Sequence, residues 1–350
     1  FLRVTSVTAM GPSGADLASG PTWEGWMEPP GYTRLPSVYL NDITAAGIDV
    51  PEGAQITLRM YGEVGALSVD ESVSGRAANP DAAQETAQDF EVVQSGRLAI
   101  DGPGGRAWEI SVTTDAAPKV KRDGEIEASY EGDAQIPFTA SDDYGVVAGS
   151  ARITLALDEA DRRYLLASDP EPRDPIEVPL PMPIAGDRAG FTEALVENFS
   201  LHPWANLPVV LELRVEDEAG QTGIAESEVI TLPGRRFFDP MAAAVIEQRR
   251  ALLWTRENVP DISQLLRAIS HRPDDVFRSA VPYLRLRTIL RRMEAAGPSM
   301  SPEAQDELAQ AMWDLAIILE EGDLASAMER LRRAQERLSE AMKNGASEQE

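Results

Sequence analysis

Apolar and polar residues alternate in short runs through the first two thirds of the chain, and Gly, Pro and Asp residues separate these runs. A period of two residues places one set of side chains in a core and the other set in solvent, so each run predicts a β-strand. Their spacing is typical of antiparallel β-sandwiches. The runs occupy residues 2–7, 55–60, 108–113, 134–140, 149–157, 208–215 and 225–232.

Two immunoglobulin-like β-sandwiches fit this part of the chain, because one such sandwich takes about 100 residues. We expect the first over residues 1–117 and the second, of bacterial immunoglobulin-like type, over residues 118–234, with the join near Ala116-Ala117-Pro118. The glycine-rich segment 101–105 has no helix after it, so it predicts a hairpin turn and not a phosphate-binding loop.

From Asp239 onward the apolar period changes to 3.6 residues, which predicts an α-helical region over residues 235–345. Asp239-Pro240 has the form of a helix cap followed by a proline at the first helical position. Further helices are expected to begin at Asp261, Asp274 and Ser301-Pro302, and Pro282 is expected to kink the third.

The end of the chain predicts an antiparallel helical hairpin. Gly322 is expected to stop the fourth helix and Asp323 to cap a fifth, and a loop this short leaves the two helices antiparallel. Residues 346–350 are small and polar and are expected to fray. The heptad-like apolar seam of the two helices consists of Leu308, Met312, Leu315, Leu319, Leu324, Met328, Leu331, Leu338 and Met342.

Charge and composition restrict the function classes. The 350 residues include 58 acidic and 32 basic side chains, a net charge of −26, of which residues 1–117 carry −10, residues 118–234 carry −14 and residues 235–350 carry −2. Such an acidic surface repels phosphate backbones and anionic headgroups, so no nucleic-acid partner is expected. The absence of Cys excludes a disulfide framework, a thiol nucleophile and Cys-ligated zinc.

No apolar run approaches the roughly 18 residues that a membrane span requires. The chain begins at Phe1 without the features of a targeting segment. We therefore expect any membrane anchor to lie outside this sequence.

The clearest acidic cluster is Asp142-Asp143-Tyr144-Gly145. With Asp217 from another loop, Asp142 and Asp143 could supply oxygen ligands to Ca²⁺. An Asx-type turn with Gly145 at the awkward backbone position is the preferred interpretation, because no spacing of the DxDxDG kind is present. No metal site is therefore assigned.

The sequence contains no recognisable catalytic motif. His202 and His271 lie far apart in different predicted domains, and neither the HExxH nor the GxSxG pattern occurs. We therefore expect neither catalytic residues nor a cofactor, and a non-enzymatic protein.

Arginines spaced by seven residues mark one predicted helix. The members Arg278, Arg285 and Arg292 could hold phosphate or lipid headgroups, or dock on an acidic surface. A solvated helix face is the preferred alternative. We retain Arg285 and Arg292 as candidate binding residues.

An aromatic and proline-rich patch lies near the N-terminus. Trp23, Trp26 and Tyr32 are candidate binding residues, since exposed Trp and Tyr are common at recognition sites. Packing at the lip of the sandwich is the alternative.

Two motifs carry a resemblance to a known family. The segment from Trp26 to Thr33 reads W-x-x-P-P-x-Y-T, and the second motif is Asp142-Asp143-Tyr144-Gly145-Val146. Both resemble motifs of alphaproteobacterial, inner-membrane-anchored envelope proteins that share a domain of unknown function. The resemblance implies transmembrane helices preceding a region outside the cytoplasm, and a helical then Gln- and Gly-rich C-terminal part. It implies no catalytic residues.

Together these features favour a non-enzymatic scaffold or protein-interaction module on the periplasmic side of the bacterial inner membrane. Its expected partners are other envelope or membrane proteins, or further copies of the chain bound through the helices. The alternative is binding or hydrolysis of carbohydrate or peptidoglycan by sandwich loops that carry Trp23, Trp26 and Trp204. The two hypotheses differ in whether these tryptophans surround a cleft or lie in cores.

Overall fold

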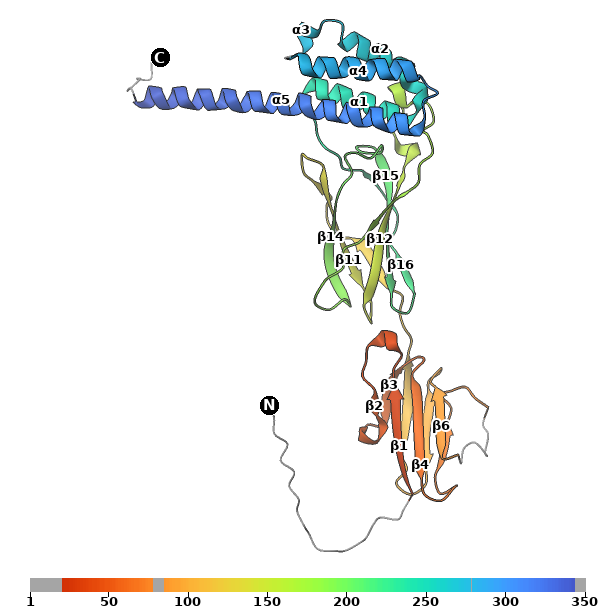
Figure 1. Cartoon of the computed structure of the whole chain (residues 1–350). Coiled ribbons are helices and arrows are strands. Elements are labelled where there is room, and N and C mark those ends of the chain that lie inside the picture. The colour runs from red at the N-terminus through yellow and green to blue at the C-terminus, as the bar shows by residue number, and fades with distance from the viewer. Residues whose placement is uncertain (1–20, 78–84, 278, 344–350) are drawn as a thin grey trace. The chain divides into compact units, whose positions relative to one another are not determined.

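The computed structural model describes residues 21–77, 85–277 and 279–343 (Figure 1). The strand expected at residues 2–7 and the tail at 346–350 lie outside these ranges. The chain forms two compact units. The first comprises Phe1–Pro118 with the loops Asp142–Gly145 and Asp217–Gln221, and the second comprises the remaining residues, so the second sandwich and the helices share one unit.

The first unit contains a sandwich of two four-stranded sheets. Strand β3 runs parallel to β8, whereas the other pairs in these two sheets are antiparallel, so the sandwich departs from a wholly antiparallel pattern. One sheet has the order β2 (Val38–Tyr39), β1 (Thr22–Glu28), β4 (Gln55–Tyr61) and β6 (Ala87–Glu91). The other has the order β3 (Gly47–Pro51), β8 (Ala107–Thr113), β7 (Gly96–Asp101) and β5 (Ser68–Glu71).

Alternating side chains build the core of this sandwich. In β4 the residues Ile56, Leu58 and Met60 are buried while their neighbours are not, which is the period of two that the sequence predicts. Trp108 of β8 is fully buried between the sheets. The segment 101–105 forms the predicted hairpin turn between the antiparallel strands β7 and β8.

The second sandwich belongs to the second unit and also has two sheets (Figure 1). The long strands β11 and β15 alternate buried and less buried residues and supply much of the core. One sheet contains β9 (Lys119–Arg122), β10 (Glu127–Ala128), β11 (Asp133–Ser141) and β14 (Gly190–Asn198). The other contains β12 (Val146–Leu155), β13 (Ile176–Pro179), β15 (Pro208–Asp217), β16 (Thr222–Ile224) and β17 (Glu228–Thr231).

The helical region begins at the predicted cap. The Asp239 carboxylate accepts hydrogen bonds from the backbone N–H groups of Met241 and Ala242, and Pro240 occupies the first helical position. The helices are α1 (Pro240–Trp254), α2 (Val259–Ile269), α3 (Pro273–Val276), α4 (Ala280–Ala296) and α5 (Pro302–Lys343). Short 3-10 turns lie at Gly31–Thr33, Leu40–Asp42, Leu157–Glu159, Tyr164–Leu166 and Arg256–Asn258.

The predicted kink at Pro282 is wrong. The segment expected to form one helix from Asp274 is divided into α3 and α4, and Pro282 lies in the first turn of α4. A proline lacks an N–H donor, and in the first turn that donor has no helical partner in any case. The chain therefore starts a new helix at Ala280, just before this proline, instead of bending an existing one.

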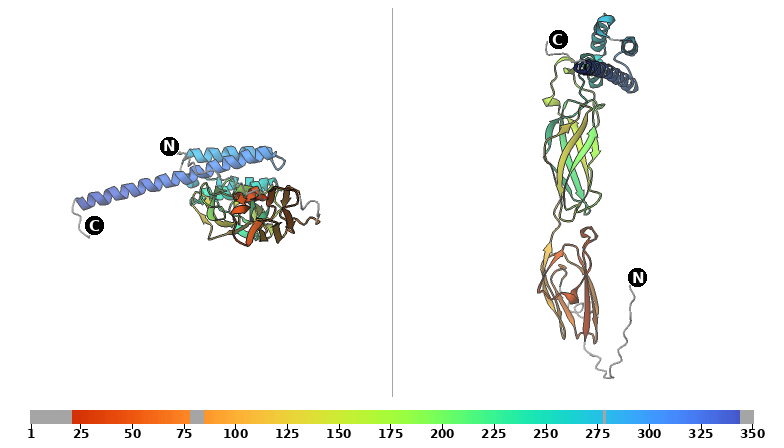
Figure 2. Two further views of the ribbon diagram at one scale, coloured as in Figure 1. Left: turned by 90° about the horizontal axis from the view of Figure 1, so that it is seen from below. Right: turned by 90° about the vertical axis from the view of Figure 1, so that its left-hand side faces the viewer.

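The predicted helical hairpin is also wrong, because α5 continues without a break through Gly322 and Asp323 (Figures 1 and 2). A glycine inside a helix costs about 1 kcal/mol relative to alanine. Ending the helix at Gly322 and starting a new one would lose the backbone hydrogen bonds that span this junction. Leu, Ala, Met, Glu and Arg residues dominate the second half of α5 and favour the continuous helix.

A continuous helix turns the two halves of the apolar seam to different sides. The seam of the first half, which ends at Leu319, would next reach position 322, but the following apolar residue is Leu324. This shift of two positions is a rotation of about 200° around the helix axis. The first half packs against α1 and α4 through buried residues that include Leu308, Met312 and Leu315. In the second half Met328, Leu331 and Leu338 are 72%, 60% and 63% exposed.

Candidate functional site

Trp23, proposed from the sequence as a binding residue, lies in the core of the first sandwich. It is 8% exposed, its indole N–H donates to the carbonyl of Gly104 at 2.9 Å, and its ring meets Trp108 edge to face at 5.7 Å. A ring held in this way stabilises the sandwich and offers no face to a ligand.

Trp26 and Tyr32 do not join Trp23 in one surface. Trp26 lies on the opposite face of β1, half-buried against Tyr39 at 5.6 Å. Tyr32 meets the ring of Tyr144 at 5.5 Å, and burial, together with Asp115, raises the pKa of its hydroxyl. Trp204 of the second sandwich is buried against the His202 ring. Neither Trp23 nor Trp204 is therefore open for stacking on a sugar.

Asp142 forms the predicted turn. Its Oδ2 accepts the backbone N–H groups of Tyr144 at 3.0 Å and Gly145 at 2.7 Å, and Gly145 has a φ of +104°. This φ lies in the region that favours glycine. Asp217 closes a second turn by accepting the N–H of Gln221 at 2.7 Å. The acidic cluster therefore has a structural role in its own loops.

Four carboxylate oxygens near these turns have no hydrogen-bond partner although they are buried: both of Asp115, Oδ1 of Asp142 and Oδ2 of Asp217. Burial and the neighbouring acids Asp143, Asp217 and Asp142 raise the pKa of Asp115, although Gln221 opposes the shift. Within the described ranges, no group of three or more Asp, Glu or His side chains is arranged to hold a metal ion.

The raised pKa of Asp115 predicts that Asp115→Asn stabilises the protein at pH 7 in a metal-chelating buffer. A carboxyl whose pKa is raised on folding stabilises the fold below its unfolded pKa, near 3.8, and this stabilisation is lost as pH rises through the folded value. The gain in unfolding temperature should therefore be present at pH 7 and vanish near pH 3.5, as measured by calorimetry. Asp70→Asn, at an exposed position of β5, is the control. A lower unfolding temperature for Asp115→Asn at pH 7 would contradict the prediction, and a Ca²⁺-dependent rise that this variant abolishes would indicate a shared cation.

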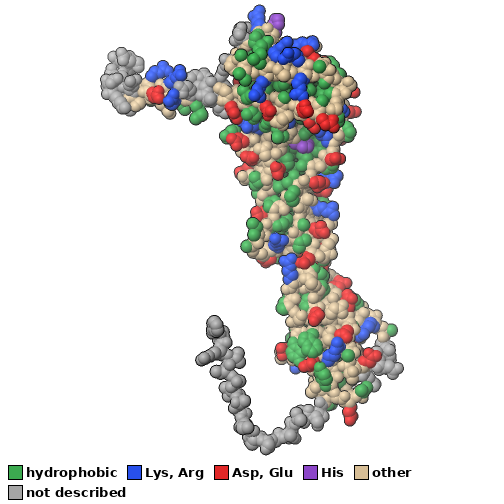
Figure 3. Space-filling view, in the orientation of Figure 1, with side chains coloured by type: hydrophobic (Ala, Val, Ile, Leu, Met, Phe, Trp, Pro, Cys, Tyr) green, Lys and Arg blue, Asp and Glu red, His purple; other side chains and the backbone are tan. Residues whose placement is uncertain are grey.

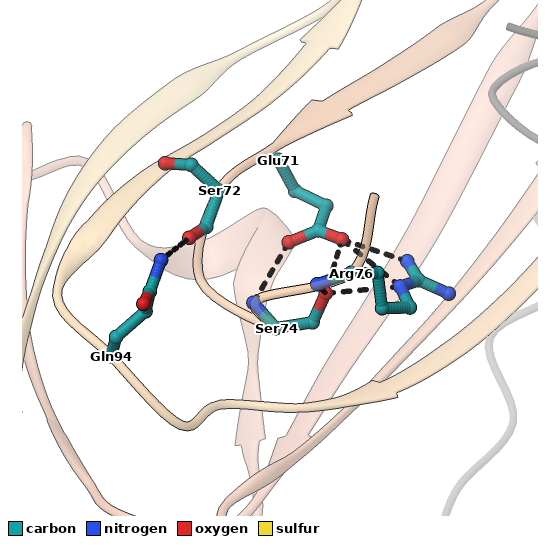
Figure 4. Close-up of polar contacts among 5 residues, drawn as sticks. All are labelled: Glu71, Ser72, Ser74, Arg76 and Gln94. Carbon is teal, nitrogen blue, oxygen red and sulfur yellow. Dashed lines mark hydrogen bonds and ion pairs between the residues drawn. The ribbon is translucent and has the colours of Figure 1, made fainter. Parts of the chain in front are cut away.

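A third polar cluster lies at the end of β5 and is shown in Figure 4. Burial alone would raise the pKa of Glu71, but the Ser74 hydroxyl, the Ser74 backbone N–H and the Arg76 guanidinium donate to its carboxylate and hold the pKa below its usual range. Gln94 donates to the backbone carbonyl of Ser72 at 2.7 Å. The base that accepts from the Ser74 hydroxyl is the Glu71 carboxylate, which Arg76 also holds in its charged form. A carboxylate with a lowered pKa is a weak base, so the cluster closes a turn and does not activate a nucleophile.

Arg285 and Arg292 lie exposed on α4, as expected for a solvated helix face. Arg292 pairs with Glu307 of α5. Lys and Arg side chains gather on the helical region in the view of Figure 3. Arg278 lies outside the described residues.

The candidate site that sequence reasoning missed is a pair of neighbouring cavities beside α1, where the loops at one end of the second sandwich meet the helices. The first, of about 540 Å³, extends from the Tyr164 turn to Leu265 of α2. The second, of about 400 Å³, is lined by Ser200, His202, Pro203, Ala205, Asn206, Arg235, Arg236, Phe237, Phe238, Ala243, Ile246, Glu247, Arg249, Arg250 and Trp313. Asn206, Glu247 and Arg250 line both.

Arg249 and His202 are the most strongly perturbed groups in the second cavity. Arg249 is 7% exposed and donates to the backbone carbonyls of Leu201 at 2.7 Å and Ala309 at 3.1 Å. Burial lowers its pKa to about 10, with the field of Asp306 opposing and that of Arg173 assisting. Burial also lowers the pKa of His202 to about 4, assisted by Arg173 and Arg249. The imidazole is therefore neutral at pH 7, and its Nδ1 accepts the N–H of Trp204.

The protein belongs to the class of multidomain proteins in which two β-sandwiches precede a helical region. This architecture confirms the predicted fold class, except for the terminal helical hairpin. The chain belongs to the family described as "Domain of unknown function (DUF4175)", whose model matches residues 2–350. No curated protein matches the chain.

Several solved structures are similar to parts of the chain. A DUF3823 family protein from Bacteroides ovatus has 9% identity and a TM-score of 0.22, over 43% of this chain and 81% of its own. The fibronectin(III)-like modules of Clostridium thermocellum CbhA have 12% identity and a TM-score of 0.20, over 55% and 92%. The FN1-FN3 domains of chicken CNTN1 have 12% identity and a TM-score of 0.21, over 55% and 64%.

Proposed function

We propose that the chain is a non-enzymatic assembly module of the bacterial envelope, which associates with a second copy of itself through the second half of α5. The observation that carries this proposal is the exposed apolar seam of that helix. Three large apolar side chains, Met328, Leu331 and Leu338, are each at least 60% exposed, on a segment that lies beyond the packed helices (Figure 1). An apolar stripe of this kind on a helix is typical of a surface that packs against another helix.

The spacing of the seam supports a helical partner. Leu324, Leu331 and Leu338 recur every seven residues, and Met328 and Met342 occupy the alternate heptad positions. Gln335 is a polar residue in the middle of the seam, where one polar side chain selects register and the number of strands. The adjoining heptad positions hold Ala327, Ala334 and Ala341, whose small size allows two helices to approach closely.

The charge distribution supports a second copy as the partner. Two copies of a chain with a net charge of −26 repel each other over most of their surface. Residues 323–343, in contrast, hold four acidic and five basic side chains, so two of these segments can meet without net repulsion. A symmetric pair requires only one self-complementary surface.

The proposed location is the periplasmic side of the inner membrane, with anchoring by segments outside this sequence. The motif from Trp26 to Thr33 and the motif at Asp142 support this location through the envelope proteins they resemble. In the part of the chain that the structure describes, no helix is both long and apolar enough to cross a bilayer. The alternative of carbohydrate binding by Trp23, Trp26 and Trp204 is not favoured, because Trp23 and Trp204 are buried.

Site-specific crosslinking in native membranes tests the proposal. A photoreactive residue at position 335, inside the seam, is expected to yield a crosslinked dimer of the full-length protein in the inner-membrane fraction. The same residue at position 333, on the outer side of the helix, should yield little. Crosslinks that join position 335 only to other proteins, or fractionation of the protein away from the inner membrane, would overturn the proposal.

A further inference from the structure

The 400 Å³ cavity beside α1 concentrates positive charge within a strongly acidic protein. Arg235, Arg236, Arg249 and Arg250 line it, and Glu247 is the acidic residue among its lining side chains. The chain as a whole carries 58 acidic and 32 basic side chains, so this local ratio is inverted. Clefts lined by one sign of charge attract ligands of the opposite sign.

In the described part of the chain, direct ion pairs do not occupy these guanidinium groups, although the field of Asp306 acts on Arg249. Within the described residues, none of the four arginines forms an ion pair. Arg249 donates from Nε and Nη2 to two backbone carbonyls, and the Arg235 Nε is buried without a hydrogen-bond partner. A buried donor without a partner carries a desolvation penalty, which an acceptor from a ligand would remove.

An aromatic wall borders the same cavity. The rings of Phe237 and Trp313 meet edge to face at 5.5 Å, and the guanidinium groups of Arg235 and Arg249 lie over these rings at 5.6 Å and 5.4 Å from their centroids. Stacking on a ring fixes the plane of a guanidinium while its edge remains able to donate. His202 is neutral, so the positive charge of the cavity comes from its arginines.

We propose that this cavity binds a phosphoryl group. Arginine pairs with phosphate through two parallel hydrogen bonds, and a dianion matches several guanidinium groups better than a singly charged carboxylate does. The cavity volume of about 400 Å³ is large enough for the phosphoryl group and a small organic part. The group can come from inorganic phosphate, from a soluble phosphate ester or from a phospholipid headgroup.

Calorimetric titration of the whole chain at pH 8, at fixed ionic strength, tests the proposal. Inorganic phosphate is expected to bind saturably with a Kd in the millimolar range, whereas chloride does not. Arg235→Gln combined with Arg236→Gln should weaken binding at least tenfold. Glu247→Gln, which removes the acidic residue of the lining, should tighten it several-fold. The matched control is Arg287→Gln with Arg291→Gln on α4, which removes the same charge outside the cavity and should change Kd by less than twofold.

The source of the phosphoryl group is resolved by two further probes, glycerol 1-phosphate and vesicles of phosphatidylglycerol in phosphatidylcholine. Binding of the soluble ester alone indicates a small ligand, and binding of vesicles that is lost in the Arg235/Arg236 variant indicates a lipid headgroup. The proposal is overturned if phosphate shows no saturable binding, or if the control weakens binding as much as the cavity variant does. Circular dichroism of each variant verifies that the fold is retained.

Discussion

A variant with Leu331→Gln and Leu338→Gln is expected to be monomeric at concentrations at which the unmodified chain is dimeric. Burying one leucine side chain contributes about 1.5–3 kcal/mol. A symmetric dimer buries four such side chains, Leu331 and Leu338 from each copy. Even half of the lower figure per side chain, about 3 kcal/mol in total, weakens dimerisation more than a hundredfold. Glutamine is a good helix former, so α5 itself should persist. Sedimentation equilibrium measures the change.

The control replaces Arg333 and Arg337 by Gln on the same helix, outside the seam. It introduces two glutamines and should leave the dimer within about threefold of its original affinity. An unmodified chain that is monomeric at 100 µM would contradict self-association through α5. Equal weakening by both variants would show that association does not depend specifically on the apolar seam.

The fold was largely predictable because alternation and helical periodicity are local signals. The runs at residues 55–60 and 108–113 lie within β4 and β8, and the cap at Asp239 begins α1 as expected. The error at Gly322 has a physical cause. A glycine followed by aspartate is compatible with a helix end and also with a helix interior. The chain turns only if packing between the two resulting helices outweighs the backbone hydrogen bonds that the turn loses. The shift of the seam between Leu319 and Leu324 was the sequence signal that the two halves do not face the same way.

The candidate site was not predictable in the same way, because its residues come from distant parts of the chain. His202, Arg235, Arg249 and Trp313 are brought together only when α1 and α5 pack beside the end of the second sandwich. The sequence does hold a weak signal, since Arg235-Arg236 and Arg249-Arg250 are adjacent basic pairs around the start of the helical region. The aromatic patch failed as a site for the opposite reason: large aromatic residues also fill cores, and the sequence does not distinguish these environments.

A second large effect, on thermal stability, is expected from substitution of Glu320, a residue of α5 that accepts hydrogen bonds from the backbone at the start of α1. This residue is 3% exposed, and its carboxylate accepts the backbone N–H of Phe238 at 2.9 Å and that of Asp239 at 2.8 Å. These donors lie just before the first turn of α1, where the helix dipole also favours a negative charge. Asp239 in turn caps the helix, so Glu320 positions the capping residue.

Glu320→Ala should therefore destabilise the second unit by about 2–4 kcal/mol, because it removes two hydrogen bonds to a charged acceptor and leaves their donors unsatisfied. For a unit of this size the unfolding temperature should fall by roughly 5–10 °C, measured by calorimetry. Glu321→Ala changes the same side chain at an exposed neighbouring position and should have little effect. A similar loss in both variants would mean that net charge, and not the contact with residues 238 and 239, sets the stability. Helix α1 also forms one wall of the arginine-lined cavity. If Glu320→Ala weakens phosphate binding at a temperature where the protein remains folded, the contact between Glu320 and the start of α1 also shapes the cavity.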